Sequence, residues 1–88
     1  MGGLKLPVPG TRVRNIIRTL RFQNGEMTQQ QLADSVGLTR QTIIAIEQGR
    51  YSPSLEAAFK IARVFRVPLE QVFQYEEQPL RGRKAPAP

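Results

Sequence analysis

The chain has 88 residues, a length that allows one small domain with short tails and excludes a multi-domain enzyme. It contains no cysteine and no histidine, which excludes disulfide frameworks, zinc fingers, thiol nucleophiles and histidine-based catalysis. The formal net charge of +6 favours an anionic partner such as nucleic acid, but residues 1–27 carry +4 of it, residues 28–79 carry −1 and residues 80–88 carry +3. Because the excess charge lies toward the two ends, a binding surface has to be identified from motifs.

Both ends of the chain have the composition of flexible segments. Glycine and proline interrupt the first ten residues, which predicts a flexible N-terminal arm over residues 1–10. Proline and basic residues without apolar periodicity predict a disordered basic C-terminal tail over residues 76–88. The folded domain is then expected over residues 11–75. No stretch approaches the roughly 18 apolar residues of a membrane span and there is no signal-peptide core, so we expect a cytoplasmic protein without membrane contact.

The first two helices are predicted from apolar spacing and from their end signals. Apolar residues recur at helical spacing from Val13 to Leu20, which predicts a helix over about residues 12–23 that ends at Asn24-Gly25. Thr28 and Gln31 then form a capping-box pattern, which predicts a short second helix ending at Gly37.

Three further helices follow. Thr39 is expected to cap a third helix, over about residues 40–48, that directs Ile43 and Ile46 into the core. From Leu55 a fourth helix is apolar around most of its circumference and should be central. Pro68 is expected to begin a fifth short helix, because proline is tolerated at a first helical position. That helix carries Leu69, Val72 and Phe73. No strand-like alternation of useful length appears, so an all-α fold of five helices is predicted.

The second and third helices are joined by a very short link, Val36-Gly37-Leu38-Thr39. A link of this length suits the angled crossing of a helix-turn-helix, in which glycine permits the sharp reversal. The sequence Thr-Gln-Gln-Gln-Leu-Ala-Asp-Ser-Val-Gly-Leu-Thr-Arg-Gln-Thr-Ile-Ile-Ala-Ile-Glu-Gln-Gly-Arg, followed by Tyr-Ser-Pro-Ser-Leu, resembles the lambda-repressor/Cro-like (XRE) helix-turn-helix regulators. The resemblance spans roughly residues 12–73 and implies a five-helix DNA-binding domain. It also implies that the third helix enters the major groove, usually in a dimer.

The chain departs from the pattern of these regulators at a few positions. Glu26 is one extra residue in the loop before the second helix, where a bulge is expected. Arg66 stands where the regulators often have glycine, which predicts a non-glycine residue at positive φ. Ile44 and Ala45 occupy recognition-helix positions that are more often polar.

Base contacts are expected from the third helix. Arg40 and Gln41 follow the turn directly, and their side chains suit bidentate bonding to guanine and adenine. The alternative is that both are solvated helix formers. Ile44 and Ala45 lie one turn further along, where Ile44 can contact a thymine methyl, pack on a neighbouring subunit or simply be a tolerated exposed residue.

Phosphate contacts are expected on both sides of that helix. The resemblance places Gln29 against a phosphate. The loop after the third helix is placed so that its residues can contact the sugar-phosphate backbone of DNA. For Arg50, a charged residue of this loop, the alternative is that the side chain is simply solvated. The complete expected set is Gln29, Thr39, Thr42, Arg50, Tyr51 and Ser52. The resemblance also implies a structural ion pair between Arg21 and Glu47, although a partly buried arginine can still reach a phosphate.

The sequence therefore favours a sequence-specific transcriptional regulator that binds double-stranded DNA as a homodimer on a near-palindromic site. Apolar residues left over on the fifth helix and beyond it, together with Leu4, Leu6 and Val8 of the arm, suggest the dimer contact: Leu69, Val72, Phe73 and Tyr75. The alternative is that Leu69 and Phe73 close the core of the monomer and that Tyr75 only borders it. No catalytic residues, metal ligands or cofactor are expected, and no small-molecule effector. The alternative is an antitoxin-like or adaptor module that uses the same fold to bind a partner protein.

Overall fold

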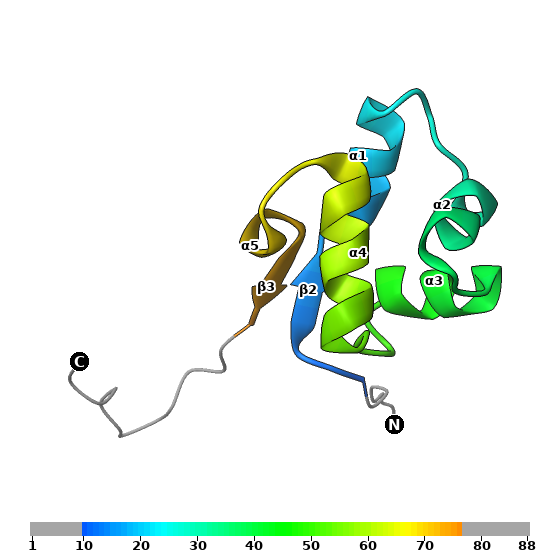
Figure 1. Ribbon diagram of the computed structural model, residues 1–88. Coiled ribbons are helices and arrows are strands. Elements are labelled where there is room, and N and C mark those ends of the chain that lie inside the picture. The colour runs from blue at the N-terminus through cyan, green and yellow to red at the C-terminus, as the bar shows by residue number, and fades with distance from the viewer. Residues whose placement is uncertain (1–9, 77–88) are drawn as a thin grey trace, which may run out of the picture.

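The computed structural model describes residues 10–76, so the expected arm and tail lie outside the described residues except for Gly10 and Glu76. No helix within that range is long and apolar enough to cross a membrane. Along the chain the elements are β2 (Val13–Asn15), α1 (Ile17–Gln23), α2 (Gln29–Val36), α3 (Arg40–Glu47), α4 (Leu55–Phe65), α5 (Leu69–Val72) and β3 (Phe73–Tyr75). In Figure 1, α4 lies at the centre, with α2 and α3 on one side and α5 and β3 on the other.

The all-α prediction holds for the five helices and misses a small sheet at the ends of the described domain. β2 and β3 pair antiparallel, with Val13 opposite Tyr75 and Asn15 opposite Phe73. The predicted start of the first helix at residue 12 is therefore wrong, because α1 begins at Ile17. The fifth helix likewise ends at Val72, before Phe73. Backbone pairing with a distant strand satisfies the hydrogen bonds that a longer helix would have made locally.

Local end signals define the helix-turn-helix. The Thr28 hydroxyl accepts a hydrogen bond from the Gln31 amide at 3.0 Å, and the Gln31 side chain accepts one from the Thr28 amide at 2.9 Å. This confirms the predicted capping box. Gly37 closes α2 in the left-handed conformation at φ 75°, and the Thr39 hydroxyl accepts from the Thr42 amide at 3.1 Å at the start of α3. The turn between α2 and α3 is thus specified by residues within it.

The core contains side chains from every described helix. The largest fully buried side chains are Ile17, Leu32, Ile43, Ile46, Ile61 and Val72. The inward direction predicted for Ile43 and Ile46 is confirmed, and these two residues hold α3 against the rest of the domain. Because one side of α3 is used for this packing, its opposite side is left to the surface.

The central helix α4 is buried on one side and exposed on the other. Its buried residues are Ala57, Ala58, Ile61, Ala62 and Phe65. Leu55 and Phe59, in contrast, are 66% and 50% exposed. The apolar circumference of this helix is therefore only partly covered by the described residues.

Within residues 10–76, two non-glycine residues adopt positive φ. The prediction for Arg66 is confirmed, because this residue closes α4 with φ 60° and ψ 41°. Glu26, the extra loop residue, has φ 58° directly after Gly25 at φ 74°. Two successive left-handed residues accommodate the insertion without displacing the capping box of α2.

Replacing Arg66 with glycine is expected to raise the free energy of unfolding by about 0.5 to 1 kcal/mol. Removing the side chain relieves a left-handed strain of about 1 to 2 kcal/mol, and the greater chain entropy of glycine offsets part of that gain. Urea denaturation followed by circular dichroism measures the change. Arg63→Gly is the matched control, and it should lower the free energy of unfolding by up to about 1 kcal/mol because Arg63 lies within the helix. Equal losses in both variants would contradict the strain at Arg66.

Candidate nucleic-acid interface

The outward side of α3 carries a ridge of four side chains, which we call the α3 ridge: Arg40, Gln41, Ile44 and Ala45. Arg40 and Gln41 are exposed, and Ile44 and Ala45 are half-buried. Helical geometry places residues i, i+1, i+4 and i+5 on adjacent positions of one face. The expected base-contacting residues therefore share one continuous surface.

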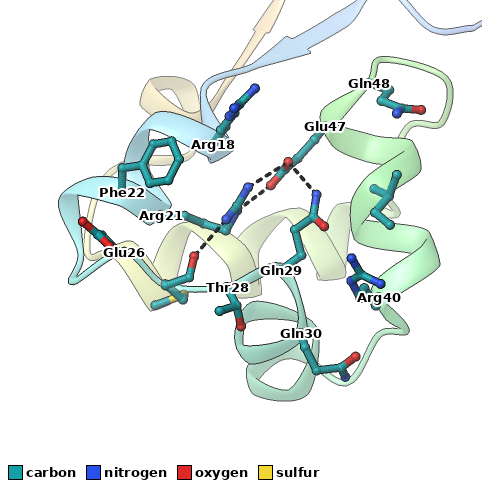
Figure 2. A pocket seen from close by; sticks show the side chains of 12 residues that line it. Arg18, Arg21, Phe22, Glu26, Thr28, Gln29, Gln30, Arg40, Glu47 and Gln48 are labelled. Carbon is teal, nitrogen blue, oxygen red and sulfur yellow. Dashed lines mark hydrogen bonds and ion pairs between the residues drawn. The ribbon is translucent and has the colours of Figure 1, made fainter.

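A hollow of about 590 Å³ lies on one side of the α3 ridge, between α1, the start of α2 and α3. Figure 2 shows the side chains around it, with Arg18 and Gln29 on one wall and Arg40 and Gln48 on the other. The structure thus brings Gln29 and Arg40, from two different helices, to one cavity.

A second hollow, of about 330 Å³, lies on the other side of the α3 ridge. It is lined by Gln41, Thr42, Ala45, Arg50 and Tyr51. Ser52, the last of the expected phosphate contacts, lies apart from this set, in a neighbouring groove with Val13 and Leu55. The α3 ridge therefore runs between two depressions, and every other expected contact except Thr39 lines one of them.

The Arg21 guanidinium and the Glu47 carboxylate form a two-point ion pair that connects α1 to the end of α3. Arg21 Nε donates to Glu47 Oε2 at 2.7 Å and Arg21 Nη2 donates to Oε1 at 3.1 Å. A third donor, Nη1, reaches the Met27 carbonyl at 2.8 Å in the loop before α2. Both charged side chains are only 9% exposed. This pair fixes α3 relative to the two elements on the other side of the hollow (Figure 2).

Gln29 adds a further bond to the same carboxylate. Its Nε2 donates to Glu47 Oε1 at 3.1 Å, and the second N–H of its amide makes no hydrogen bond within residues 10–76. The charge of Glu47 is thus compensated by Arg21, and its carboxylate accepts a hydrogen bond from Gln29. Its negative charge is therefore largely cancelled at the surface where an anion would approach.

One residue of this region, Asn15, was not among the expected contacts. The Asn15 amide donates to the Ile46 carbonyl at 2.9 Å and its oxygen accepts from the Ile17 amide at 3.1 Å, so this side chain links β2, α1 and α3. No local signal could identify Asn15, because Ile46 is distant in the sequence. The sequence also indicates Arg18 as a source of positive charge for phosphates, because it is a basic residue off the apolar stripe of the first helix. Its guanidinium carbon lies 5.7 Å from the Phe22 ring centroid.

Exposed guanidinium groups lie on the α3 ridge itself, at Arg40, and on its two sides, at Arg18 and Arg50. Arg18, Arg40 and Arg50 form no ion pair within the described part of the chain, and the Arg50 Nε donates only to the neutral Gln48 side chain at 2.8 Å. Positive charge available to a ligand thus surrounds the ridge, which is the arrangement that a polyanion requires.

Comparison with known proteins gives matches over most of the chain. A helix-turn-helix family model matches residues 17–72. An uncharacterized HTH-type transcriptional regulator of Archaeoglobus fulgidus is 45% identical over 71 residues, which cover 81% of this chain and all of the relative. Another from Methanothermobacter thermautotrophicus is 52% identical over 66 residues, or 74% of this chain and 94% of the relative. The cryptic phage CTXphi transcriptional repressor RstR of Vibrio cholerae is 33% identical over 61 residues, covering 69% of this chain and 54% of that repressor.

Proposed function

Because this chain belongs to the XRE family of helix-turn-helix, DNA-binding transcriptional regulators, we propose that it recognises a specific double-stranded DNA site through α3, as a homodimer. One observation carries the proposal: the α3 ridge projects between two hollows, each lined by arginine that forms no ion pair within residues 10–76, namely Arg18 and Arg40 in one and Arg50 in the other. An α-helix fits the major groove, whose two edges are lined by phosphates. A central ridge with positive charge on both sides matches that shape and charge distribution.

Arg40 and Gln41 read base edges in this proposal. Both are exposed in the first turn of α3, where a recognition helix meets the bases. Arginine pairs with the O6 and N7 atoms of guanine, and glutamine pairs with the N6 and N7 atoms of adenine. Ile44 and Ala45 follow one turn later and supply apolar contacts, for which the thymine methyl group is the partner.

The remaining expected residues hold the phosphates on the two sides of the groove. Gln29 has a free amide N–H at the start of α2, while Thr39 and Thr42 lie at the start of α3, where helix N-termini favour anions. Arg50 and Tyr51 lie on the opposite side of the α3 ridge from Gln29. Ser52 follows them in the exposed loop and completes the proposed set. These contacts set the register of the protein on the duplex rather than its sequence preference.

A homodimer would place two α3 helices in successive major grooves. Half-sites on one side of B-DNA repeat about every 34 Å, so a two-fold symmetric protein reads a near-palindromic site. The partly covered α4 helix supports this part of the proposal, because it leaves apolar side chains for a second subunit to bury.

Replacing Arg40 with alanine tests the proposed docking. The variant should lose about 1 to 3 kcal/mol of binding free energy per cognate base and should become tolerant at that base position, because a bidentate contact is removed. Selection of duplexes from a random library, followed by fluorescence anisotropy on the selected site, measures both effects.

The matched control is Arg66→Gly, which removes the same charge at the end of α4, outside both hollows. It should weaken binding only slightly and leave the preferred sequence unchanged. Unaltered base preference in the Arg40→Ala protein would show that α3 does not read the bases as proposed.

A further inference from the structure

β2 carries an arginine, Arg14, whose side chain lies against the loop between α3 and α4. A Cβ atom built at Gly49 in that loop would lie 3.1 Å from Arg14 Nη1, so the guanidinium packs on the bare backbone of this glycine. Gly49 is followed directly by Arg50, which lines the second hollow beside the α3 ridge. The charge of Arg14 therefore lies next to a segment with proposed phosphate contacts, although Arg14 itself lines neither hollow.

A carboxylate, that of Glu76, occupies the other edge of the same guanidinium. Arg14 Nε donates to Glu76 Oε1 at 2.5 Å, and Arg14 Nη2 lies at the same distance from that oxygen. The Glu76 amide donates to the Arg12 carbonyl at 2.8 Å, so the pairing of β2 with β3, side by side in Figure 1, holds the carboxylate in place. Arg14 Nη1, which faces Gly49, makes no hydrogen bond within residues 10–76.

The Arg14–Glu76 pair is exposed, and its two partners can therefore be exchanged at little cost. Both side chains are more than half exposed, whereas those of the Arg21–Glu47 pair are only 9% exposed. Water and salt screen an exposed pair, so it contributes little to stability. DNA offers a guanidinium a denser negative charge and the same bidentate geometry. A phosphate at this loop can thus displace the Glu76 carboxylate.

We propose that Arg14 is a further phosphate-binding residue beside the loop between α3 and α4, and that Glu76 competes with DNA for its guanidinium. This inference rests on the proposed function and extends it to a contact that the free protein holds neutralised. On binding, the Arg14 guanidinium exchanges Glu76 for a phosphate, and the carboxylate returns to water. Because a phosphate contact carries no sequence information, Glu76 lowers the affinity for every duplex and thereby limits non-specific binding.

Replacing Glu76 with glutamine tests the competition, because it removes the charge and keeps the shape of the side chain. Glu76→Gln should bind DNA about three- to fivefold more tightly, both a duplex selected from a random library and a duplex of random sequence. The logarithm of affinity should also depend more steeply on the logarithm of salt concentration, by about 0.9, the value for one added phosphate contact. Fluorescence anisotropy of the full chain over a series of salt concentrations measures both effects.

Two variants separate competition for Arg14 from a general effect of net charge. Glu56→Gln is the matched control, because it also releases a cation, Lys60, from an exposed ion pair, but on α4 and outside both hollows. It should change the affinity by less than about twofold and leave the salt dependence unaltered. The double variant Arg14→Gln with Glu76→Gln should lose the gain of Glu76→Gln and the added salt dependence, because no guanidinium remains to take the phosphate.

Unchanged or weaker DNA binding by Glu76→Gln would overturn the proposal and leave the pair as a link between the two strands. An equal gain in Glu56→Gln, or a gain that persists in the double variant, would also overturn it, since the effect would then be one of net charge. A chain that selects no preferred sequence would reject base reading by α3. The duplex of random sequence would still measure the competition by Glu76 in that case.

Discussion

Replacing Glu47 with alanine is expected to lower the free energy of unfolding by about 3 to 5 kcal/mol. The change leaves the Arg21 guanidinium, which is 9% exposed, without its carboxylate partner. Breaking a buried ion pair from one side costs this much because the remaining charge stays desolvated and uncompensated. The loss is a large fraction of the total stability of a small domain, which is about 5 to 15 kcal/mol. Urea denaturation at neutral pH measures it.

Two further variants distinguish the effect of burying an unpaired charge from the effect of removing a carboxylate. Glu76→Ala removes a carboxylate from the Arg14–Glu76 pair, whose side chains are 55% and 51% exposed, and should cost at most about 1 kcal/mol. The double variant Arg21→Met with Glu47→Leu should recover much of the stability lost in Glu47→Ala, because no unpaired charge remains buried. A similar small loss in Glu47→Ala and Glu76→Ala would contradict the inference that the Arg21–Glu47 pair is desolvated.

The second large effect is expected at Ile43. This side chain is fully buried, and Ile43→Ala should lower the free energy of unfolding by about 2 to 5 kcal/mol. The loss combines the transfer free energy of the removed carbons with the cavity they leave between α3 and the core. Because Ile43 and Ile46 hold α3 in place, DNA affinity should fall in parallel with the folded population. Thermal unfolding followed by circular dichroism measures the change in the free energy of unfolding.

The neighbouring isoleucine provides the matched control. Ile44 is half-buried on the α3 ridge, so Ile44→Ala should change the free energy of unfolding by no more than about 1 kcal/mol. If Ile44 contacts a thymine methyl, this variant should lose affinity for the cognate site while remaining folded. Equal destabilisation by the two substitutions would mean that Ile44 is a core residue rather than part of the binding surface.

Features that depend on neighbouring residues were predictable from the sequence. The capping box of Thr28 and Gln31 and the cap at Thr39 join residues three apart, and the glycine at position 37 closes a helix within its own turn. The positive φ of Arg66 is likewise a property of a helix end. Each of these structures forms from contacts within one turn of helix, so the residue types at that spacing are sufficient to specify it.

The Arg21–Glu47 contact could be predicted only in a different way. Its two residues lie in separate helices, and neither composition nor spacing indicates that they meet. Only the resemblance to the XRE regulators implied the pair. The Asn15 bond to the Ile46 carbonyl belongs to the same class of long-range contacts, and no comparable signal pointed to it.

Residue types and their spacing along the chain were enough to predict the five helices, the tight turn between α2 and α3, and the direction in which Ile43 and Ile46 point. That residues 13–15 form a strand depends on the folded domain, because their hydrogen-bond partners in β3 lie at the other end of the described domain. The folded domain also decided which part of the apolar circumference of α4 is covered and that Leu55 and Phe59 are not. Periodicity reports which residues share a face, but burial and strand pairing depend on which distant segments fold against that face.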